Sequence, residues 1–382
     1  MERYFFEGLN TEQVKTPAFI ISEDAVVRNC EILDSIRKRT GCKILLALKA
    51  FSTYSLFPVM KKYLNGVCAS SPYEAQLGRE EFGLEVHSYS AAFSRRDFDE
   101  CLSFSDHIVF NSLNQYAAFK NDVVKNLDNI SFGLRVNPEY SEAPVQIYDP
   151  CAPFSRLGIK RESLKEIPEG ISGLHFHALC EQDASALFRT ARAFEEKFSS
   201  FFSGLSWLNF GGGHHITKPE YNIDLLCDTV SYFMDKYKIT VYLEPGEAVV
   251  LNAGVLVASI LDIVHNDIDI AILDTSAAAH ICDVLEMPFT PDIARAGKSE
   301  EFPYVYRLAG QSCLSGDIIG DYSFRTPLNI GDKITILDMA HYTMVKTNTF
   351  NGLKLPDIAL HSVKNGLNWI RESSYADFKS RL

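Results

Sequence analysis

Eight short apolar runs, rich in β-branched residues, alternate with longer amphipathic stretches between residues 43 and 246. The runs cover residues 43–50, 66–71, 85–93, 107–112, 131–137, 173–180, 207–213 and 240–246. Strands that are hydrophobic along their whole length and alternate with helices are typical of a parallel sheet. Eight such units predict an α/β fold with a closed, TIM-like (β/α)8 barrel.

Two of the intervening segments carry clear helix signals. In residues 71–83, Ser71 is placed to cap a helix, and Pro72 takes its first position. Residues 183–202 have the apolar stripe of an amphipathic helix. Both segments follow apolar runs, as the barrel prediction requires.

The pattern changes after about residue 250, where strand-like runs follow one another with few helical stretches. This pattern predicts a second, mainly antiparallel β domain. A chain of 382 residues also exceeds what one hydrophobic core usually serves. We therefore expect a barrel at residues 18–248 and a β domain at residues 249–382, joined by residues 1–17.

The composition excludes several classes of protein. The net charge of −12 and the absence of a lysine- or arginine-rich block argue against nucleic-acid binding. The start of the chain lacks the features of a signal peptide, and no apolar run is long enough for a membrane span. The nine cysteines are scattered without a CxxC pair, which is typical of reduced thiols. We expect a cytoplasmic protein that binds neither nucleic acid nor membrane.

Polar side chains stand at the ends of several runs, where barrels of this type build their active sites. Lys49 ends an apolar run, so it either extends to the surface or acts as a Schiff-base nucleophile. His175 and His177 are two residues apart on a strand and therefore share one face of it. They could bind a metal as a pair, be ordinary core histidines, or place one ring against an aromatic cofactor. Further metal ligands are not evident at the other strand ends, so we expect no metal site.

A glycine triplet and a glutamate follow the last two runs. Gly211, Gly212 and Gly213 form either a tight turn or a cradle of N–H groups for a phosphate. Glu244, in the sequence EPG, is placed to face the nitrogen of a pyridine ring and keep it protonated. Together with the lysine and the histidine, these residues suggest pyridoxal 5′-phosphate.

The same motifs carry a resemblance to a known family. ALKAF, HFH, FGGG and EPG occur in an order similar to that of the fold-type III pyridoxal-phosphate decarboxylases, the alanine-racemase-like barrels that include ornithine and diaminopimelate decarboxylases. GQSCLSGD (310–317) resembles the catalytic cysteine loop of that family. HYTMVKTNTFNG (341–352) resembles its phosphate-binding tyrosine segment, so the resemblance covers nearly the whole chain.

The resemblance implies a cofactor, a set of roles and an assembly. Lys49 would carry pyridoxal 5′-phosphate as a Schiff base, His177 would stack on its ring, and Glu244 would pair with its nitrogen. The three glycines and Tyr342 would hold its phosphate. Cys313 would return a proton after carbon dioxide leaves, across the interface of an obligate homodimer formed through the β domain.

The chain departs from well-known members of the family at Glu247, where they carry arginine after EPG. An anion there suits a substrate with a distal amine, although a glutamate engaged in an outside salt bridge is the alternative. Residues 274–288, DTSAAAHICDVLEMP, resemble the branch that acts on carboxylated triamines. Asp283 in this segment and Asp317 are further candidates for binding the amine chain.

These observations predict decarboxylation of carboxynorspermidine or carboxyspermidine to norspermidine or spermidine. Within the family, the alternatives are a decarboxylase of diaminopimelate or another basic amino acid, or a racemase. From other classes, the alternatives are a non-catalytic pyridoxal-phosphate-binding protein and a metal-dependent barrel hydrolase that uses His175 and His177.

Overall fold

A computed structural model describes residues 8–143, 145–287 and 289–382 of the chain. The chain forms two compact units. One runs from Arg28 to Val249, and the other combines the segment that ends at Val27 with residues Val250–Leu382. Residues 1–7 of the predicted joining segment, and the last residue of the segment 274–288, lie outside the described residues.

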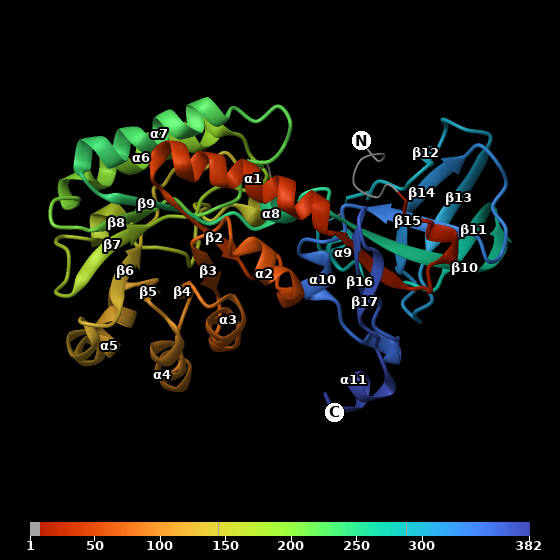
Figure 1. Cartoon of the computed structure of the whole chain (residues 1–382), viewed down its shortest axis with the longest axis horizontal. Helices are drawn as coiled ribbons and strands as arrows, with labels where there is room; N and C mark the ends of the chain where they lie inside the picture. Colours follow the sequence, from red (N-terminus) through yellow and green to blue (C-terminus); the bar gives the residue numbers. More distant parts are fainter. Residues whose placement is uncertain (1–7, 144, 288) are drawn as a thin grey trace. The chain divides into compact units, whose positions relative to one another are not determined.

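The unit from Arg28 to Val249 is a closed barrel of eight parallel strands (Figure 1). It closes because β2 pairs in parallel with β9, Lys43 opposite Tyr242 and Ile44 opposite Leu243. Each predicted apolar run overlaps one barrel strand, which confirms the fold class. The strands are β2 (Lys43–Ala47), β3 (Gly66–Ala69), β4 (Glu85–Ser90), β5 (His107–Phe110), β6 (Ser131–Arg135), β7 (Ile171–His175), β8 (Trp207–Asn209) and β9 (Thr240–Leu243).

Several barrel helices begin at residues whose side chains cap them. Ser71 Oγ accepts the backbone N–H of Glu74 at 3.2 Å, as predicted for the start of α3. Asp183 caps α6 in the same way through Ala186 at 2.9 Å. The helices are α1 (Glu23–Thr40), α2 (Phe57–Met60), α3 (Pro72–Leu77, continued by a π-turn over Gly78–Phe82), α4 (Arg95–Phe104), α5 (Leu113–Asn126), α6 (Ala184–Phe198), α7 (Ile223–Tyr237) and α8 (Glu247–Val250).

Phenylalanines fill the layer between the strands and the outer helices. Phe98 of α4 stacks on Phe119 of α5 with ring centroids 4.0 Å apart. Phe176, just after β7, lies 4.9 Å from Phe194 of α6 and is fully buried, so it faces away from the side chains of His175 and His177. This packing fixes the strand ends that carry the candidate site.

The second unit is built on a nine-stranded, mainly antiparallel sheet. Its order is β12-β14-β13-β11-β10-β1-β16-β17, with β15 also paired to β10. The strands are β1 (Ala18–Ser22), β10 (Gly254–Asn266), β11 (Ile268–Leu273), β12 (Gly297–Lys298), β13 (Tyr304–Ala309), β14 (Ile318–Phe324), β15 (Lys333–Leu337), β16 (Asp357–Ser362) and β17 (Gly366–Arg371). Three short helices accompany them: α9 (Asp283–Glu286), α10 (Thr343–Lys346) and α11 (Tyr375–Lys379).

The position of β1 corrects the expected start of the barrel at residue 18. β1 pairs antiparallel with β10 and parallel with β16, so it belongs to the sheet. All five of its residues are buried, with Ile20 and Ile21 fully covered. An apolar run without an alternating pattern does not reveal which sheet will receive it, and the boundary was therefore placed too early.

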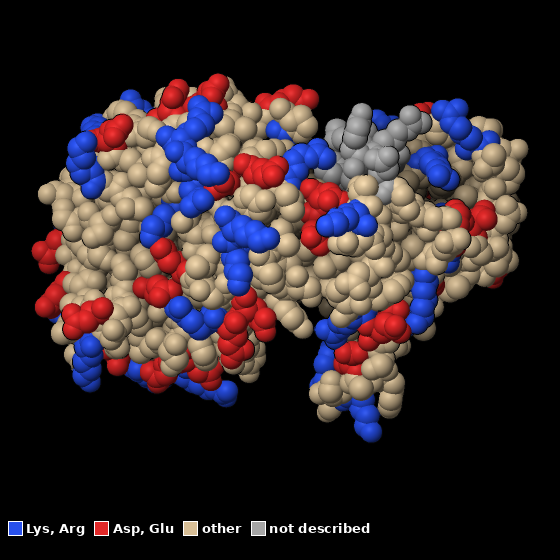
Figure 2. Space-filling model, viewed as in Figure 1, with Lys and Arg blue, Asp and Glu red and all other residues tan. Residues whose placement is uncertain are grey.

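Two observations concern the distribution of charge on the surface and the length of the apolar helices. On the face shown in Figure 2, basic and acidic side chains are interspersed over both parts of the chain. Across the described ranges, no helix is both long enough and apolar enough to cross a membrane.

Candidate active site

A cavity of about 150 Å³ lies at the C-terminal ends of the barrel strands. Lys49, His177 and Glu244, three of the predicted site residues, line it together. They follow β2, β7 and β9, which are far apart in sequence but share one end of the barrel. The other lining residues are Ala47, Cys68, Ala69, Ser70, Tyr89, Ser90, Ala91, Arg135 and His175.

Lys49 is the exposed residue of a turn that is otherwise buried. Leu48 and Ala50 on either side of it are fully covered. The Ala50 N–H donates to the Ala47 carbonyl at 3.0 Å, which closes the turn directly after β2. The local fold thus buries the neighbours and leaves the ammonium group facing the cavity.

Glu244 is a nearly buried carboxylate that remains ionised. The Asn209 side-chain amide donates to its Oε1 at 2.7 Å, and His175 Nε2 lies 3.4 Å from its Oε2. Burial opposes ionisation, but His175 and Asn209 outweigh it and lower the pKa of Glu244 to about 2. The site therefore presents a fixed negative charge at the end of β9.

The glycine loop orients His177. The Gly212 N–H donates to His177 Nδ1 at 3.0 Å, so the ring proton must lie on Nε2. Burial lowers the pKa of His177 well below its usual value, which keeps the ring neutral. Gly211 has φ +65°, and a Cβ there would lie 2.7 Å from His177 Nδ1, so this position requires glycine.

This arrangement differs from a phosphate cradle made by all three glycines. The Gly211 N–H already donates to Asn209 Oδ1 at 2.8 Å, and that of Gly212 is used by His177. In the part of the chain that the structure describes, the N–H of Gly213 is the one of the three without an acceptor. A triplet alone does not tell which N–H groups the local side chains will take.

Arg135 is a cavity residue that the sequence interpretation missed. It is 5% exposed, its guanidinium lies 4.8 Å from the centre of the Tyr89 ring, and Nη2 donates to the His177 carbonyl at 3.0 Å. Among the described residues, no carboxylate lies within ion-pair distance of it. A charged residue at the end of the run SFGLRVN was the available signal, the same one that identified Lys49.

Glu247 is paired within the barrel. Its Oε1 lies 2.9 Å from His215 Nε2, and the two side chains are 18% and 17% exposed. This hydrogen bond raises the pKa of His215 and favours its protonated form. The sequence did not reveal that His215 would supply this partner, and the contact of Glu247 with a substrate amine stays a prediction.

Two further predicted residues, Cys313 and Asp317, lie on one loop of the sheet unit. Cys313 is exposed, and its backbone N–H donates to Asn351 Oδ1 at 2.7 Å. Asp317 is 3% exposed and accepts from Ser276 Oγ at 2.8 Å and from the backbone N–H groups of Ala277 and Ser312. Its carboxylate therefore holds the loop together, in contrast to the expected contact with substrate.

Asp283 and Tyr342 lie elsewhere in the sheet unit. Asp283 and Glu286 both form ion pairs with Lys346, so the acidic segment already has a cation. Tyr342 precedes α10 with φ 47° and ψ −54°, a backbone conformation that residues other than glycine rarely adopt. Strain of this kind clusters at functional sites, which keeps Tyr342 a candidate.

Comparisons with known proteins identify a family and similar chains. The family model for pyridoxal-dependent decarboxylases (described as their C-terminal sheet domain) matches residues 51–340. The carboxynorspermidine/carboxyspermidine decarboxylase of Campylobacter jejuni is 44% identical, covering 97% of this chain and 99% of the relative. The carboxyaminopropylagmatine decarboxylase of Synechocystis is 36% identical, covering 98% and 97%.

A solved structure extends the likeness to three dimensions. The crystal structure of carboxynorspermidine decarboxylase from Campylobacter jejuni, complexed with norspermidine, matches with a TM-score of 0.90 at 43% identity. The match covers 97% of this chain and 100% of that one. Both units are therefore included in the likeness.

Proposed function

Because the chain belongs to the pyridoxal-dependent decarboxylase family, we propose that it decarboxylates a carboxylated triamine. The substrate is carboxynorspermidine or carboxyspermidine, and the products are carbon dioxide with norspermidine or spermidine. The observation that carries this substrate is the 44% identity, over nearly the full length of both chains, to a relative with that activity. The enzyme depends on pyridoxal 5′-phosphate, like its family.

The barrel cavity fits this cofactor in its chemistry. The exposed amine of Lys49 would hold the cofactor covalently, and the neutral ring of His177 would lie against its pyridine face. The ionised carboxylate of Glu244 would keep the pyridine nitrogen protonated. When bound, the cofactor supplies an electron sink for the pair left when the bond from Cα to the carboxylate carbon breaks.

The phosphate would lie at the glycine loop. The Gly213 N–H would donate to it, and Tyr342 would contribute its hydroxyl. Gly211 and Gly212 would act indirectly, by holding Asn209 and His177 in place. Arg135, a buried cation in the cavity, is placed to receive an anionic group of the cofactor or substrate.

The remaining roles concern the proton and the amine chain. Cys313 would deliver the proton to Cα after carbon dioxide leaves, and its exposure fits this task. Glu247 would act on the distal ammonium groups as part of its pair with His215. Asp283 would do so by exchanging Lys346 for a substrate ammonium, while Asp317 would keep the cysteine loop in shape.

We further propose a homodimer in which Cys313 serves the barrel of the partner subunit. Mixing Lys49→Ala and Cys313→Ala subunits tests this directly, because each variant alone lacks one essential group. If the sites are shared, about a quarter of them become intact after random reassociation, and activity returns. Absence of any recovery in mixed dimers would place both residues in one subunit's site.

The function itself is tested by carbon dioxide release from purified, cofactor-loaded protein. The panel is carboxynorspermidine, carboxyspermidine, carboxyaminopropylagmatine, meso-diaminopimelate, ornithine and arginine. Turnover of the first two with kcat/KM at least tenfold above the others supports the proposal. Preference for diaminopimelate would overturn the substrate while leaving the family membership intact.

Carboxyaminopropylagmatine is the second candidate substrate, favoured by the 36% identity to the Synechocystis relative. It carries a guanidinium where the triamines carry an ammonium. The two cations differ in shape and in the number of hydrogen bonds they donate. The same panel separates them, because a site that fits one terminal cation penalises the other.

A further inference from the structure

Three potential metal ligands gather at the N-terminal ends of two neighbouring barrel strands, away from the cavity described above. Glu85 and His87 are the first and third residues of β4, and His107 is the first residue of β5. Glu85 and His87 are two residues apart and so share one face of the strand. His87 stands opposite His107 in the register of the two strands.

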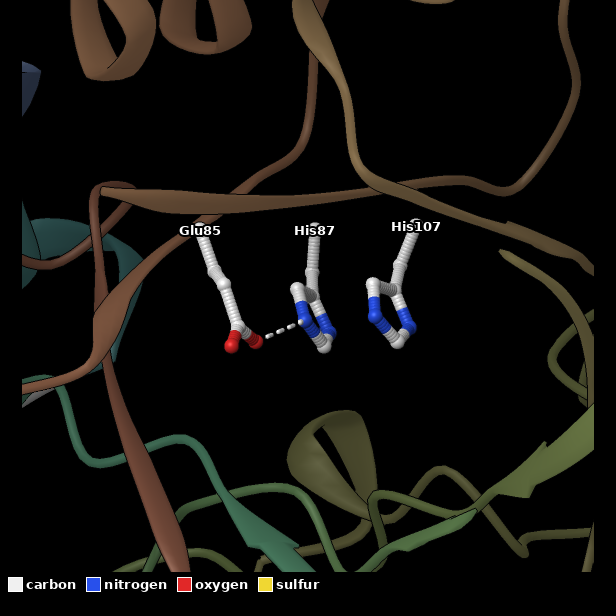
Figure 3. A group of neighbouring side chains, drawn as sticks. All are labelled: Glu85, His87 and His107. Atoms are coloured by element: carbon white, nitrogen blue, oxygen red, sulfur yellow. Dashed lines mark hydrogen bonds and ion pairs between the residues drawn. The ribbon is translucent and has the colours of Figure 1, made fainter. Parts of the chain in front are cut away.

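The donor atoms of these side chains are close together. One ligand atom from each residue lies within 4.8 Å of the other two. Glu85 Oε2 is 3.4 Å from His87 Nε2, and the two imidazole rings stack with centroids 3.8 Å apart. Figure 3 shows the carboxylate and the two rings side by side in the barrel interior.

The imidazoles have unused hydrogen-bonding capacity. His87 is 2% exposed, and its Nδ1 is buried without a hydrogen-bond partner among the described residues. The Nδ1 of His107 is in the same condition. Buried polar atoms usually have partners, because leaving one unpaired costs free energy. Two unpaired imidazole nitrogens in one cluster therefore call for an explanation.

An ion can reach this cluster from outside. A cavity of about 550 Å³ is lined by Glu85, Asp106, His107, Asp128, Ser131 and Ser172, among others. Glu85 and Asp106 are paired with Lys43 and Arg79, so of the three carboxylates Asp128 would add most to the attraction for a cation.

We propose that Glu85, His87 and His107 bind a divalent transition-metal ion, with Zn²⁺ as the best match. Two imidazoles and one carboxylate are a common zinc ligand set. Imidazole nitrogen also favours zinc over magnesium or calcium, which prefer oxygen ligands. The fourth position would be open to water from the cavity. The sequence predicted no metal, because His107 is far from the HxH motif that directed attention to the other end of the barrel.

Two features of the site limit its affinity. Lys43 pairs with Glu85, and its ammonium must leave before a divalent ion can use that carboxylate. The lysine side chain is 36% exposed, so it has room to move into solvent. The rings lie within 11° of parallel, and one must tilt before both nitrogens can point at one ion. We therefore expect a dissociation constant on the order of micromolar rather than the much tighter binding of structural zinc sites.

Equilibrium dialysis of the tag-free, cofactor-loaded protein against ZnCl₂ tests the proposal, with bound zinc measured by elemental analysis. The comparison is made in a Cys313→Ser background, which removes the exposed thiol as a competing ligand. We expect one ion per chain and at least tenfold weaker binding in His107→Gln and Glu85→Gln. His265→Gln, which alters an exposed histidine paired with Asp269, should leave binding unchanged.

Lys43→Met provides a test that does not depend on losing a ligand. Removing the competing ammonium should tighten zinc binding about tenfold if the ion and the lysine share Glu85. The proposal is overturned if the protein takes up no zinc at 100 μM free ion. It is also overturned if His107→Gln and Lys43→Met bind zinc as the parent protein does.

Discussion

His215 and Glu247 form a largely buried ion pair, with Nε2 of the imidazole 2.9 Å from Oε1 of the carboxylate. The hydrogen bond to Glu247 raises the pKa of His215 in the folded protein. A raised folded pKa contributes stability below the pKa of the unfolded state and loses it as pH rises through the folded value. The pair should therefore stabilise the barrel at pH 6 and contribute little at pH 9.

The Glu247→Gln variant measures this contribution. We expect its free energy of unfolding to fall by about 1 kcal/mol at pH 6, with a smaller loss at pH 9. Urea titrations at both pH values provide the measurement. In a His215→Gln background the pH dependence of the loss should disappear, because the titrating partner is absent. Equal losses at both pH values would show that Glu247 stabilises the fold through other contacts.

Glu244 and Asn209 should act as one unit in catalysis. Glu244→Gln removes the charge proposed to hold the pyridine nitrogen protonated, and we expect kcat to fall by about 100- to 1000-fold. Asn209→Ala removes a donor at 2.7 Å from Glu244 Oε1 and should lower kcat by roughly tenfold.

The double variant separates positioning from a general structural effect. If Asn209 acts through Glu244, adding Asn209→Ala to Glu244→Gln should cause little further loss in kcat. The absorbance spectrum of the bound cofactor checks that each variant is loaded. A full additional tenfold loss would mean that Asn209 has a separate role.

The barrel could be predicted because its signals are local. Most barrel strands are buried on both faces, so they appear in the sequence as nearly continuous apolar runs. Lys49, His177 and Glu244 could be found for the same reason, since a charged or imidazole group interrupts such a run at its end. All three line one cavity, as expected.

Other features depend on contacts between residues that are distant in the sequence, which no local pattern predicts. His215 reaches Glu247 from the loop after a different strand, and Gly212 gives its N–H to His177 rather than leaving it for an anion. Asp317 lies in a turn, where aspartate is common, but its partner Ser276 is 41 positions away. β1 was assigned to the wrong unit because its apolar run fits either sheet.

Asp317 should be needed for the stability of the cysteine loop. Its buried carboxylate accepts hydrogen bonds from Ser276, Ala277 and Ser312. In Asp317→Asn, the side-chain NH₂ group would replace one carboxylate oxygen and face hydrogen-bond donors. We expect a loss of about 2–4 kcal/mol in the free energy of unfolding. Asp262→Asn, at an exposed position of the same unit, is the matched control and should change it by less than about 0.5 kcal/mol.

The reactivity of Cys313 gives a second readout of the same variant. Loss of the hydrogen bond from the Ser312 N–H should loosen the loop, so that a thiol reagent labels Cys313 faster in Asp317→Asn than in the parent protein. Cys313 is exposed while Cys68, Cys151 and Cys180 are partly buried, so a Cys313→Ser control identifies the label on Cys313. Unchanged labelling together with unchanged stability would contradict the role assigned to Asp317.

Gly173 should be essential for closing the barrel around Trp207. A Cβ at this position would lie 2.1 Å from Cδ2 and Cε2 of the indole, and the ring is held by a hydrogen bond from its Nε1 to Ser131 Oγ at 2.8 Å. Gly173→Ala therefore forces the ring out of its site, and we expect a loss of about 3 kcal/mol or more in the free energy of unfolding. Gly316→Ala, with no atom within 4 Å of the added Cβ, should be tolerated.

Adding Trp207→Phe to Gly173→Ala tests whether the clash with the indole causes the loss. The double variant should recover part of the lost stability in urea titrations, because the smaller ring leaves room for the methyl group. If the losses of the two single variants simply add, the clash with the indole is not the cause.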